Sequence, residues 1–267
     1  MTTGTPAPAG LALASYERPA GVNPPLNYPA YRSTALRAPR QPLQVMPQGL
    51  TEVTGPLLGR ERVIAADADL TTQHEGEPIG ERIIVTGRVL DGDGRAVPDT
   101  LIEIWRANAA GLYRHGADQH PAPLDPNFTG AGRCMTDSEG RYRFVTIKPG
   151  AYPWQNHPNA WRAQHIHFSL FGLAFTQRLV TQMFFPSDPL FAQAPIFNSA
   201  PEAARERMIS RFRLDLTEPD WALRAVADPG RRATLIATAQ PGPPGGPGGY
   251  RFDIHLQGDQ ETVFFDV

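Results

Sequence analysis

Prolines are spread along almost the whole chain, and many of them lie near its start. Nine of them fall within the first 47 residues: Pro6, Pro8, Pro19, Pro24, Pro25, Pro29, Pro39, Pro42 and Pro47. A proline has no backbone N–H and restricts the residue before it, so this spacing excludes a long helix. We therefore expect residues 1–80 to form a proline-rich, extended N-terminal arm and residues 81–267 to form one folded domain.

Short apolar runs separated by turns predict β structure in that domain. The 28 prolines and 25 glycines suit many turns, while 41% hydrophobic residues suffice for a core. Runs rich in β-branched and aromatic residues predict strands at 83–90, 100–105, 141–145, 170–175, 178–185, 234–238 and 250–256. The turn at 91–94 predicts a hairpin between the first two strands, and the turn at 137–140 precedes a half-buried strand. We expect an all-β fold, an antiparallel β-sandwich.

One short helix interrupts the strand pattern. Ser199 and Glu202 have the spacing of a capping box, in which each side chain bonds the other residue's backbone. The predicted helix buries Ala204, Met208, Ile209 and Phe212.

Bulk properties exclude several kinds of partner and location. A formal net charge of -2 argues against nucleic acid or an anionic membrane surface as partners. No apolar run approaches the roughly 20 residues of a membrane span, and the N-terminus lacks the pattern of a signal peptide. The single cysteine, Cys134, permits no internal disulfide, so we expect a cytoplasmic protein.

The candidate chemistry centres on His165-Ile166-His167. Alternate residues of a strand project to the same face, so one metal ion could bind both imidazoles. The same pattern fits a half-buried strand with a polar face. His74, His115, His120, His157 and His255 lie in polar loops or outward strand positions and are not expected to be ligands.

Two tyrosines extend the candidate metal site. Tyr113 follows a predicted strand, and Tyr152 lies in the turn Pro149–Pro153. Either one alone also fits a core aromatic residue. Structural zinc would favour thiolates, and ferrous oxygenases add a carboxylate to two histidines, but the sequence has neither Cys-x-x-Cys nor a carboxylate in the His-x-His segment. Phenolate oxygen is a hard anionic ligand and favours Fe(III).

Seven further motifs and the His-Ile-His-Phe run resemble one known family. The motifs are Gly87-Arg88-Val89, Asn127-Phe128, Gly132-Arg133-Cys134, Thr136-Asp137-Ser138, Lys148-Pro149-Gly150, Trp161-Arg162 and Thr181-Gln182. Together they resemble the intradiol ring-cleavage dioxygenases from about Tyr31 to the C-terminus. The resemblance implies a prealbumin-like sandwich and a ferric ion held by Tyr113, Tyr152, His165 and His167.

The resemblance also implies roles for residues around the metal. Arg162 would stabilise negative charge on the substrate ring, although its place three residues before His165 puts it on the opposite face of a continuous strand. Gln182 would support Arg162, and Trp154 would line the substrate pocket. Tyr31 would lie near a substrate carboxylate. Tyr152 would be the catalytic tyrosine that leaves the metal and accepts a substrate proton.

The reaction implied is cleavage of 3,4-dihydroxybenzoate by O2 to 3-carboxy-cis,cis-muconate, as in family members that pair with a homologous α subunit. The arm's apolar residues suggest that it covers such a partner: Tyr28, Tyr31, Leu36, Leu43, Val45, Met46 and Leu50. Two alternatives remain. One is a catechol or hydroxyquinol 1,2-dioxygenase, whose helical N-terminal region the prolines exclude here. The other is a metal-free prealbumin-like binding module, which leaves the tyrosines and histidines unexplained.

Overall fold

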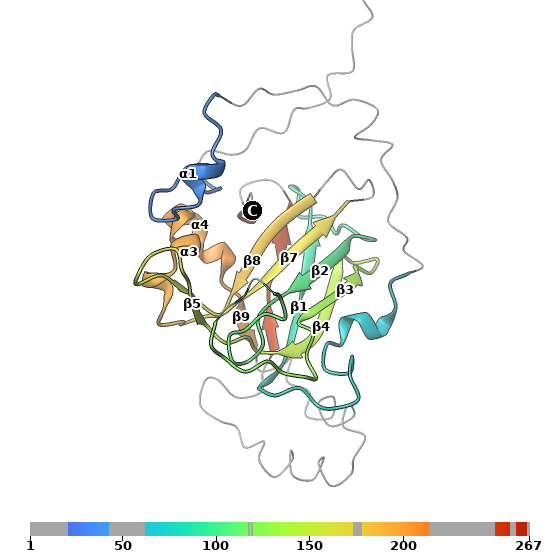
Figure 1. Cartoon of the computed structure of the whole chain (residues 1–267). Helices are drawn as coiled ribbons and strands as arrows, with labels where there is room; N and C mark the ends of the chain where they lie inside the picture. Colours follow the sequence, from blue (N-terminus) through green and yellow to red (C-terminus); the bar gives the residue numbers. More distant parts are fainter. Residues whose placement is uncertain are drawn as a thin grey trace, which may run out of the picture.

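The chain is mostly β structure with a few short helices (Figure 1). The computed structural model describes residues 21–42, 62–116, 118, 120–172, 178–213, 249–256 and 260–265. Its strands are β1 (Arg82–Leu90), β2 (Leu101–Trp105), β3 (Ala131–Met135), β4 (Arg141–Ile147), β5 (Tyr152–Pro153), β6 (Trp161–Arg162), β7 (His165–Phe171), β8 (Arg178–Phe184), β9 (Arg211–Arg213), β10 (Gly249–Arg251) and β11 (Ile254–His255). The predicted strand at 234–238 lies outside the described residues.

The first sheet is mixed, which corrects the prediction of a purely antiparallel fold. Strand β1 pairs antiparallel with β4 along one edge, and along the other edge it pairs parallel with β10 and then β11. The predicted hairpin between β1 and β2 is also wrong. The turn at 91–94 brings Leu90 and Ala96 together in a single antiparallel bridge, and β2 then belongs to a second sheet. Long-range burial, which the local turn pattern does not encode, selects β4 as the partner of β1.

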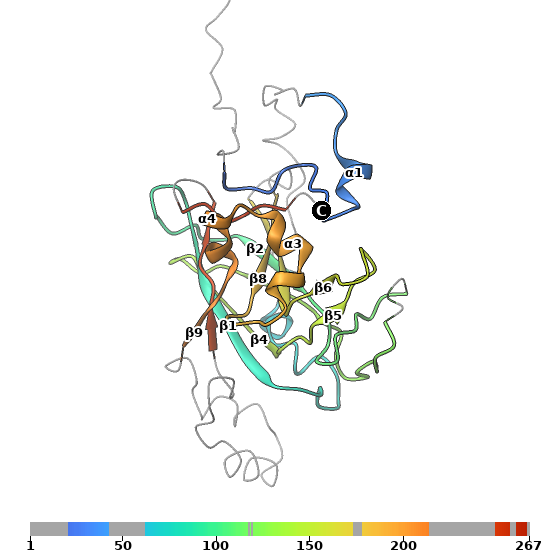
Figure 2. The same cartoon turned by 90° about the vertical axis from the view of Figure 1, so that its left-hand side faces the viewer.

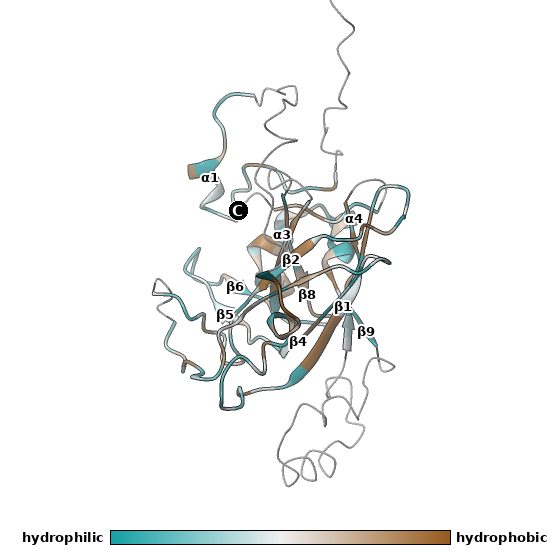
Figure 3. Cartoon of the chain, turned by 90° about the vertical axis from the view of Figure 1, so that its right-hand side faces the viewer, coloured by the Kyte–Doolittle hydropathy of each residue, from teal (hydrophilic) through white to brown (hydrophobic). Residues whose placement is uncertain are grey.

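The second sheet is antiparallel, in the order β3-β2-β7-β8, and it positions the histidines. Residues Ile166 and Phe168 of β7 are fully buried in a cluster with Val85 of β1 and Phe144 of β4. Both sheets thus contribute to one hydrophobic core, and β1 is hydrophobic over much of its length (Figure 3). The alternation of β7 leaves His165 and His167 on the other face of the sheet.

The described residues contain more helices than the single one predicted, and none of these helices has Ser199 as its N-cap. The described helices are α1 (Thr34–Arg37), η2 (Ala65–Ala68), η3 (Phe191–Gln193), α3 (Pro195–Ser199), α4 (Glu202–Arg205) and η4 (Glu206–Met208). The capping-box prediction is wrong, because Ser199 ends α3, where its hydroxyl donates to the Ile196 carbonyl, and Pro201 precedes α4. Ala204 and Met208 are buried as predicted, whereas Ile209 follows η4 and is only partly buried, and Phe212 belongs to β9. No described helix is long and apolar enough to span a membrane.

Part of the arm packs on the chain itself. Tyr31 joins a second hydrophobic cluster with Phe184, Phe197 and Phe265, on the side of the sheets where α1, α3 and α4 gather (Figures 1 and 2). The Asn156 amide donates to the Ala30 carbonyl, and the Phe264 amide donates to Asn23. Leu70, also within residues 1–80, is fully buried in the main core, whereas Leu36 is 92% exposed. Leu43, Val45, Met46 and Leu50 lie outside the described residues.

Candidate active site

The two histidines of β7 meet at their Nε2 atoms, which lie 3.2 Å apart. His165 Nδ1 lies 2.6 Å from the Ala163 carbonyl, which can only accept, so this nitrogen carries the proton. The Nε2 lone pair of His165 is then directed into the site. Burial lowers the pKa of both imidazoles well below the usual value, and Arg162 lowers it further. Both rings are therefore neutral at pH 7, the form that binds metals.

The two tyrosines come from different parts of the chain and converge on the histidines. Tyr113 lies in the long loop between β2 and β3, with its hydroxyl 3.5 Å from His165 Nε2. Tyr152 lies in β5, and its ring centroid is 5.7 Å from that of Tyr113 and 5.9 Å from that of His165. Burial, and then Tyr152, raise the pKa of Tyr113 well above its ordinary value. Without a metal ion, Tyr113 is therefore a neutral phenol.

Arg162 reaches the histidines because it does not belong to their strand. It lies in β6, which pairs with β5 so that Tyr152 and Arg162 are opposite each other. Ala163 and Gln164 separate β6 from β7, so the strand-face argument against Arg162 does not apply. Its buried guanidinium donates from Nη2 to Gln182 Oε1 at 2.6 Å and to His165 Nε2 at 2.9 Å.

Gln182 is buried at the site rather than exposed as an outward polar residue. It lies in β8 directly opposite His167 and has no exposed surface. Its Oε1 accepts from Arg162, while its Nε2 is buried without a hydrogen-bond partner among the described residues. A buried amide left half-satisfied is costly, which is consistent with a further group binding beside Arg162.

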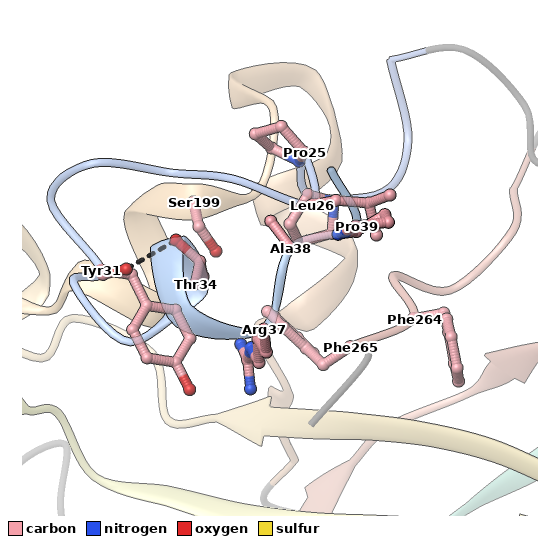
Figure 4. A pocket seen from close by; sticks show the side chains of 11 residues that line it. Pro25, Leu26, Tyr31, Thr34, Arg37, Ala38, Pro39, Ser199, Phe264 and Phe265 are labelled. Atoms are coloured by element: carbon pink, nitrogen blue, oxygen red, sulfur yellow. Dashed lines mark hydrogen bonds between the residues drawn. The ribbon is translucent and has the colours of Figure 1, made fainter. Parts of the chain in front are cut away.

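Trp154 and Tyr31 extend the site toward the arm. The Arg162 guanidinium lies 5.5 Å from the Trp154 ring centroid, and Tyr31 meets Trp154 edge to face at 5.1 Å. On its other side, Tyr31 lines a cavity of about 200 Å³ between the arm and the C-terminal segment, shown in Figure 4. Arg37 also lines this cavity, with its guanidinium over the Tyr31 ring. Tyr31 therefore connects the arm to the residues around Arg162.

Two residues near the site were missed from sequence. Trp105 stacks on His167, with ring centroids 4.8 Å apart and planes nearly parallel. Trp105 pairs with His167 in the register of β2 and β7, which only the sheet reveals. Arg106 is buried, and burial lowers its pKa to about 9. Neither its Nη1 nor its Nη2 has a hydrogen-bond partner in the described part of the chain.

The residues present fit a metal ion that accepts phenolate ligands. In the described ranges, no group of three or more His, Cys, Asp or Glu side chains could hold a metal. A metal ion bound at His165 and His167 would therefore need another kind of ligand, such as a tyrosine oxygen. Two nitrogens about 2.1 Å from one ion and at a right angle lie about 3 Å apart, close to the observed 3.2 Å between Nε2 atoms. Arg162 would have to give up its bond to His165 Nε2 when an ion binds there.

Two family models match this chain. The model described as "Dioxygenase" matches residues 53–258. The model described as "Protocatechuate 3,4-dioxygenase beta subunit N terminal" matches residues 16–49. Together they cover most of the arm and of the sheets.

Curated relatives and solved structures agree with these matches. The chain is 54% identical over 242 residues to the protocatechuate 3,4-dioxygenase beta chain of Burkholderia cepacia, covering 90% of this chain and 92% of that one. It is 29% identical over 234 residues to the alpha chain of that enzyme from Pseudomonas putida, covering 84% and 99%. The crystal structure of a mutant of Acinetobacter radioresistens catechol 1,2 dioxygenase has a TM-score of 0.50 and 17% identity, over 74% of this chain and 56% of that one. This last likeness concerns the fold alone.

Proposed function

Since this chain belongs to the protocatechuate 3,4-dioxygenase beta-chain family of intradiol dioxygenases, we propose that it cleaves 3,4-dihydroxybenzoate with O2 to 3-carboxy-cis,cis-muconate. The observation that carries this function is the convergence of two phenols and two imidazoles, with the two Nε2 atoms 3.2 Å apart. Domain boundaries at 1–80 and 81–267 and a prealbumin-like sandwich belong to the same proposal.

Ferric iron is the proposed cofactor, held by Tyr113, Tyr152, His165 and His167. When bound, Fe(III) would withdraw electron density from a chelated catecholate so that its ring reacts with O2. The hard phenolate oxygens support the ferric state. The neutral imidazoles support binding at pH 7, because no proton has to leave them.

Tyr152 is proposed as an internal base. A catechol that binds as a dianion loses two protons, and the phenolate of Tyr152 would accept one of them. Protonation of one phenolate as the dianion binds would help to keep the buried site free of net charge, which avoids the cost of an isolated buried charge. Tyr152 lies on the short strand β5, whereas Tyr113 contacts His165 through its hydroxyl and His167 through its ring. By resemblance to the family, Tyr152 is the tyrosine proposed to leave.

Arg162 is proposed to stabilise negative charge that develops on the substrate ring. It is a fixed cation beside the metal ligands, and the 2.6 Å bond to Gln182 holds it in place. Trp154, whose ring the guanidinium faces, is proposed to line the substrate pocket. Tyr31, which contacts Trp154, is proposed to lie near the substrate carboxylate.

A homologous α chain is the proposed partner. The relatives named as alpha and beta chains of one enzyme support a hetero-oligomer, and both resemble this chain. The arm carries Leu36 at 92% exposure, an apolar side chain that a partner surface would cover. The buried thiol of Cys134 fits a reducing compartment, so we propose the cytoplasm.

Oxygen uptake by the chain co-purified with its α partner tests the reaction. We expect uptake with 3,4-dihydroxybenzoate and a product mass equal to substrate plus both atoms of O2. Faster turnover of catechol or hydroxyquinol would favour the alternative intradiol activities; the chain is 34% identical over 131 residues to a hydroxyquinol 1,2-dioxygenase. Purified protein that contains no iron and consumes no oxygen would instead favour the metal-free binding module.

A further inference from the structure

Three segments carry the proposed metal ligands, and hydrogen bonds of two residues, Asn108 and Gln164, tie these segments together. The segments are the loop with Tyr113, the turn with Tyr152 and the start of β7 with His165. Asn108 acts through both its side chain and its backbone carbonyl, and Gln164 acts through its side-chain amide.

Asn108 holds the Tyr113 loop. This residue is 5% exposed, and its Oδ1 accepts from the backbone amides of Ala110 and Leu112 at 2.9 and 3.0 Å. Its Nδ2 donates to the Pro123 carbonyl at 2.9 Å. The Asn108 backbone amide also donates to the carbonyl of Leu112, the residue before Tyr113. Both ends of this side-chain amide thus fix the loop that presents Tyr113.

The same residue reaches the Tyr152 turn. The Gly150 amide donates to the Asn108 carbonyl at 2.9 Å. Gly111, with φ +81°, packs so closely on this turn that an added Cβ would meet the Ala151 carbonyl. The two tyrosine segments are therefore in direct backbone contact, with Asn108 bonded to both.

Gln164 joins the Tyr152 turn to the histidine strand. Its Nε2 donates to the Pro149 carbonyl at 3.0 Å, and its backbone amide donates to the buried carboxylate of Asp188 at 2.7 Å. It directly precedes His165, whose Nδ1 bonds to Ala163. One hydrogen bond thus links the turn of Tyr152 to the residue that precedes β7.

We propose that Asn108 and Gln164 are positioning residues that fix the backbones of the three ligand segments relative to one another. Tyr152 would then move off a bound ion and return to it by rotation of its side chain, while its turn stays in place. This inference rests on the proposed function. It assigns these residues no contact with substrate.

Two substitutions remove one hydrogen-bond donor each. Asn108→Asp keeps the oxygen acceptor for Ala110 and Leu112 but cannot donate to Pro123. Gln164→Met keeps the length of the side chain but loses the bond to Pro149. Asn198→Asp is the matched control, because Asn198 Nδ2 also donates to backbone carbonyls, those of Phe191 and Ala192, in the segment around η3 and α3.

The test measures iron loss to a chelator, the position of the visible phenolate-to-iron band, and the anaerobic rate of substrate chelation, on protein purified with its α partner. We expect iron loss about 10- to 100-fold faster in Asn108→Asp, as for other residues that orient metal ligands. In Gln164→Met we expect slower chelation with iron retained. The melting temperatures should stay within the range of the Asn198→Asp control.

Wild-type rates and band position in both variants would overturn the inference, as would equal changes in Asn198→Asp. If Asn108→Asp fails to fold, Gln164→Met alone decides the outcome, because its half-buried side chain is held by the single bond to Pro149 among the described residues. Wild-type protein that lacks the phenolate-to-iron band would instead contradict the proposed function. The two failures are thereby distinguishable.

Discussion

At the scale of single residues, the chemistry depends on which side chains bind the metal and which only lie near it. His165 and His167 meet at their Nε2 atoms, while His74 bonds to Thr129 on an exposed loop. Removing the His74 side chain, and separately that of His165 or His167, therefore compares a histidine outside the site with the two proposed ligands. The assignment of Tyr113, Tyr152, His165 and His167 as ligands stays a prediction until such a comparison is made.

Replacing His165 or His167 by alanine should remove the iron. Each change deletes one of four proposed ligands, so we expect the iron content per chain to fall by about tenfold or more. Elemental analysis of purified protein measures this. His74→Ala should retain the wild-type iron content. Stoichiometric zinc in the wild-type protein, with no visible charge-transfer band, would contradict the ferric assignment.

Replacing the two tyrosines by phenylalanine should have different effects. Tyr152→Phe should still bind iron and chelate substrate, but roughly 100-fold more slowly, because the internal base is lost. Tyr113→Phe should weaken iron binding itself. Stopped-flow absorbance without oxygen measures chelation, and iron content measures retention. Unchanged chelation in Tyr152→Phe would exclude its role as a base.

At the scale of elements, two turns that each begin with an aspartate lie next to strand ends. Asp91 accepts from the amides of Asp93 and Arg95, and Asp137 accepts from those of Glu139 and Arg141. Each turn contains a glycine in the left-handed region, Gly94 with φ +78° and Gly140 with φ +69°. Both turns were predicted from sequence and are present, although the turn at 91–94 does not join β1 to β2 as a hairpin.

Alanine at these two glycines should destabilise the fold unequally. Gly94→Ala should cost about 1 kcal/mol of unfolding free energy, because only the backbone conformation is strained and no atom lies within 4 Å of the added Cβ. Gly140→Ala should cost more, because its Cβ would also meet the Val89 carbonyl at 2.6 Å. Urea denaturation of both variants measures the difference. Equal losses of unfolding free energy would show that the turn at Gly140 moves enough to accommodate the added Cβ without further cost.

Acid should loosen one attachment of the segment around η2. Arg133 donates to Asp67 at 2.8 Å, and this bond lowers the pKa of Asp67 below its usual 3.8. A carboxyl group whose pKa is lower in the folded protein than in the unfolded chain stabilises the fold at pH values above its unfolded pKa. This stabilisation is lost as the pH falls through the folded pKa. The protection of amides at residues 62–70 against hydrogen exchange, relative to the intrinsic rate at each pH, should therefore fall below about pH 4. Asp67→Asn should show this lower protection already at pH 7, with an effect below about 1 kcal/mol because the pair is partly exposed.

At the scale of the whole molecule, the arm both packs on its own chain and leaves apolar surface exposed. Tyr31 is buried against Trp154, whereas Leu36 five residues later is almost fully exposed. The arm therefore connects the site region to the surface proposed for the α chain.

Co-expression with a homologous α chain should yield a stable complex. Obligate interfaces are large, upwards of about 2,000 Å², so the complex should survive gel filtration at low concentration. Light scattering after gel filtration measures its mass. Leu36→Asp should weaken the complex, while Leu124→Asp, at an exposed apolar residue outside the arm, should leave the complex intact. Full dioxygenase activity of a stable monomer would contradict the need for a partner.

The sequence by itself determined the local features of this protein. Alternation of apolar residues predicted β1, β2 and β4, and it put His165 and His167 on one face of β7. The Asp-Gly turns were equally visible. These features depend on neighbouring residues alone, through backbone preferences and the two-residue period of a strand.

Only the tertiary structure decided which segments meet. The parallel pairing of β1 with β10 and β11 joins residues more than 150 positions apart, and the register of β2 and β7 puts Trp105 on His167. The separate strand β6 turns Arg162 toward His165. Strand partners and buried contacts of this kind depend on the joint burial of distant apolar faces, which no local pattern specifies.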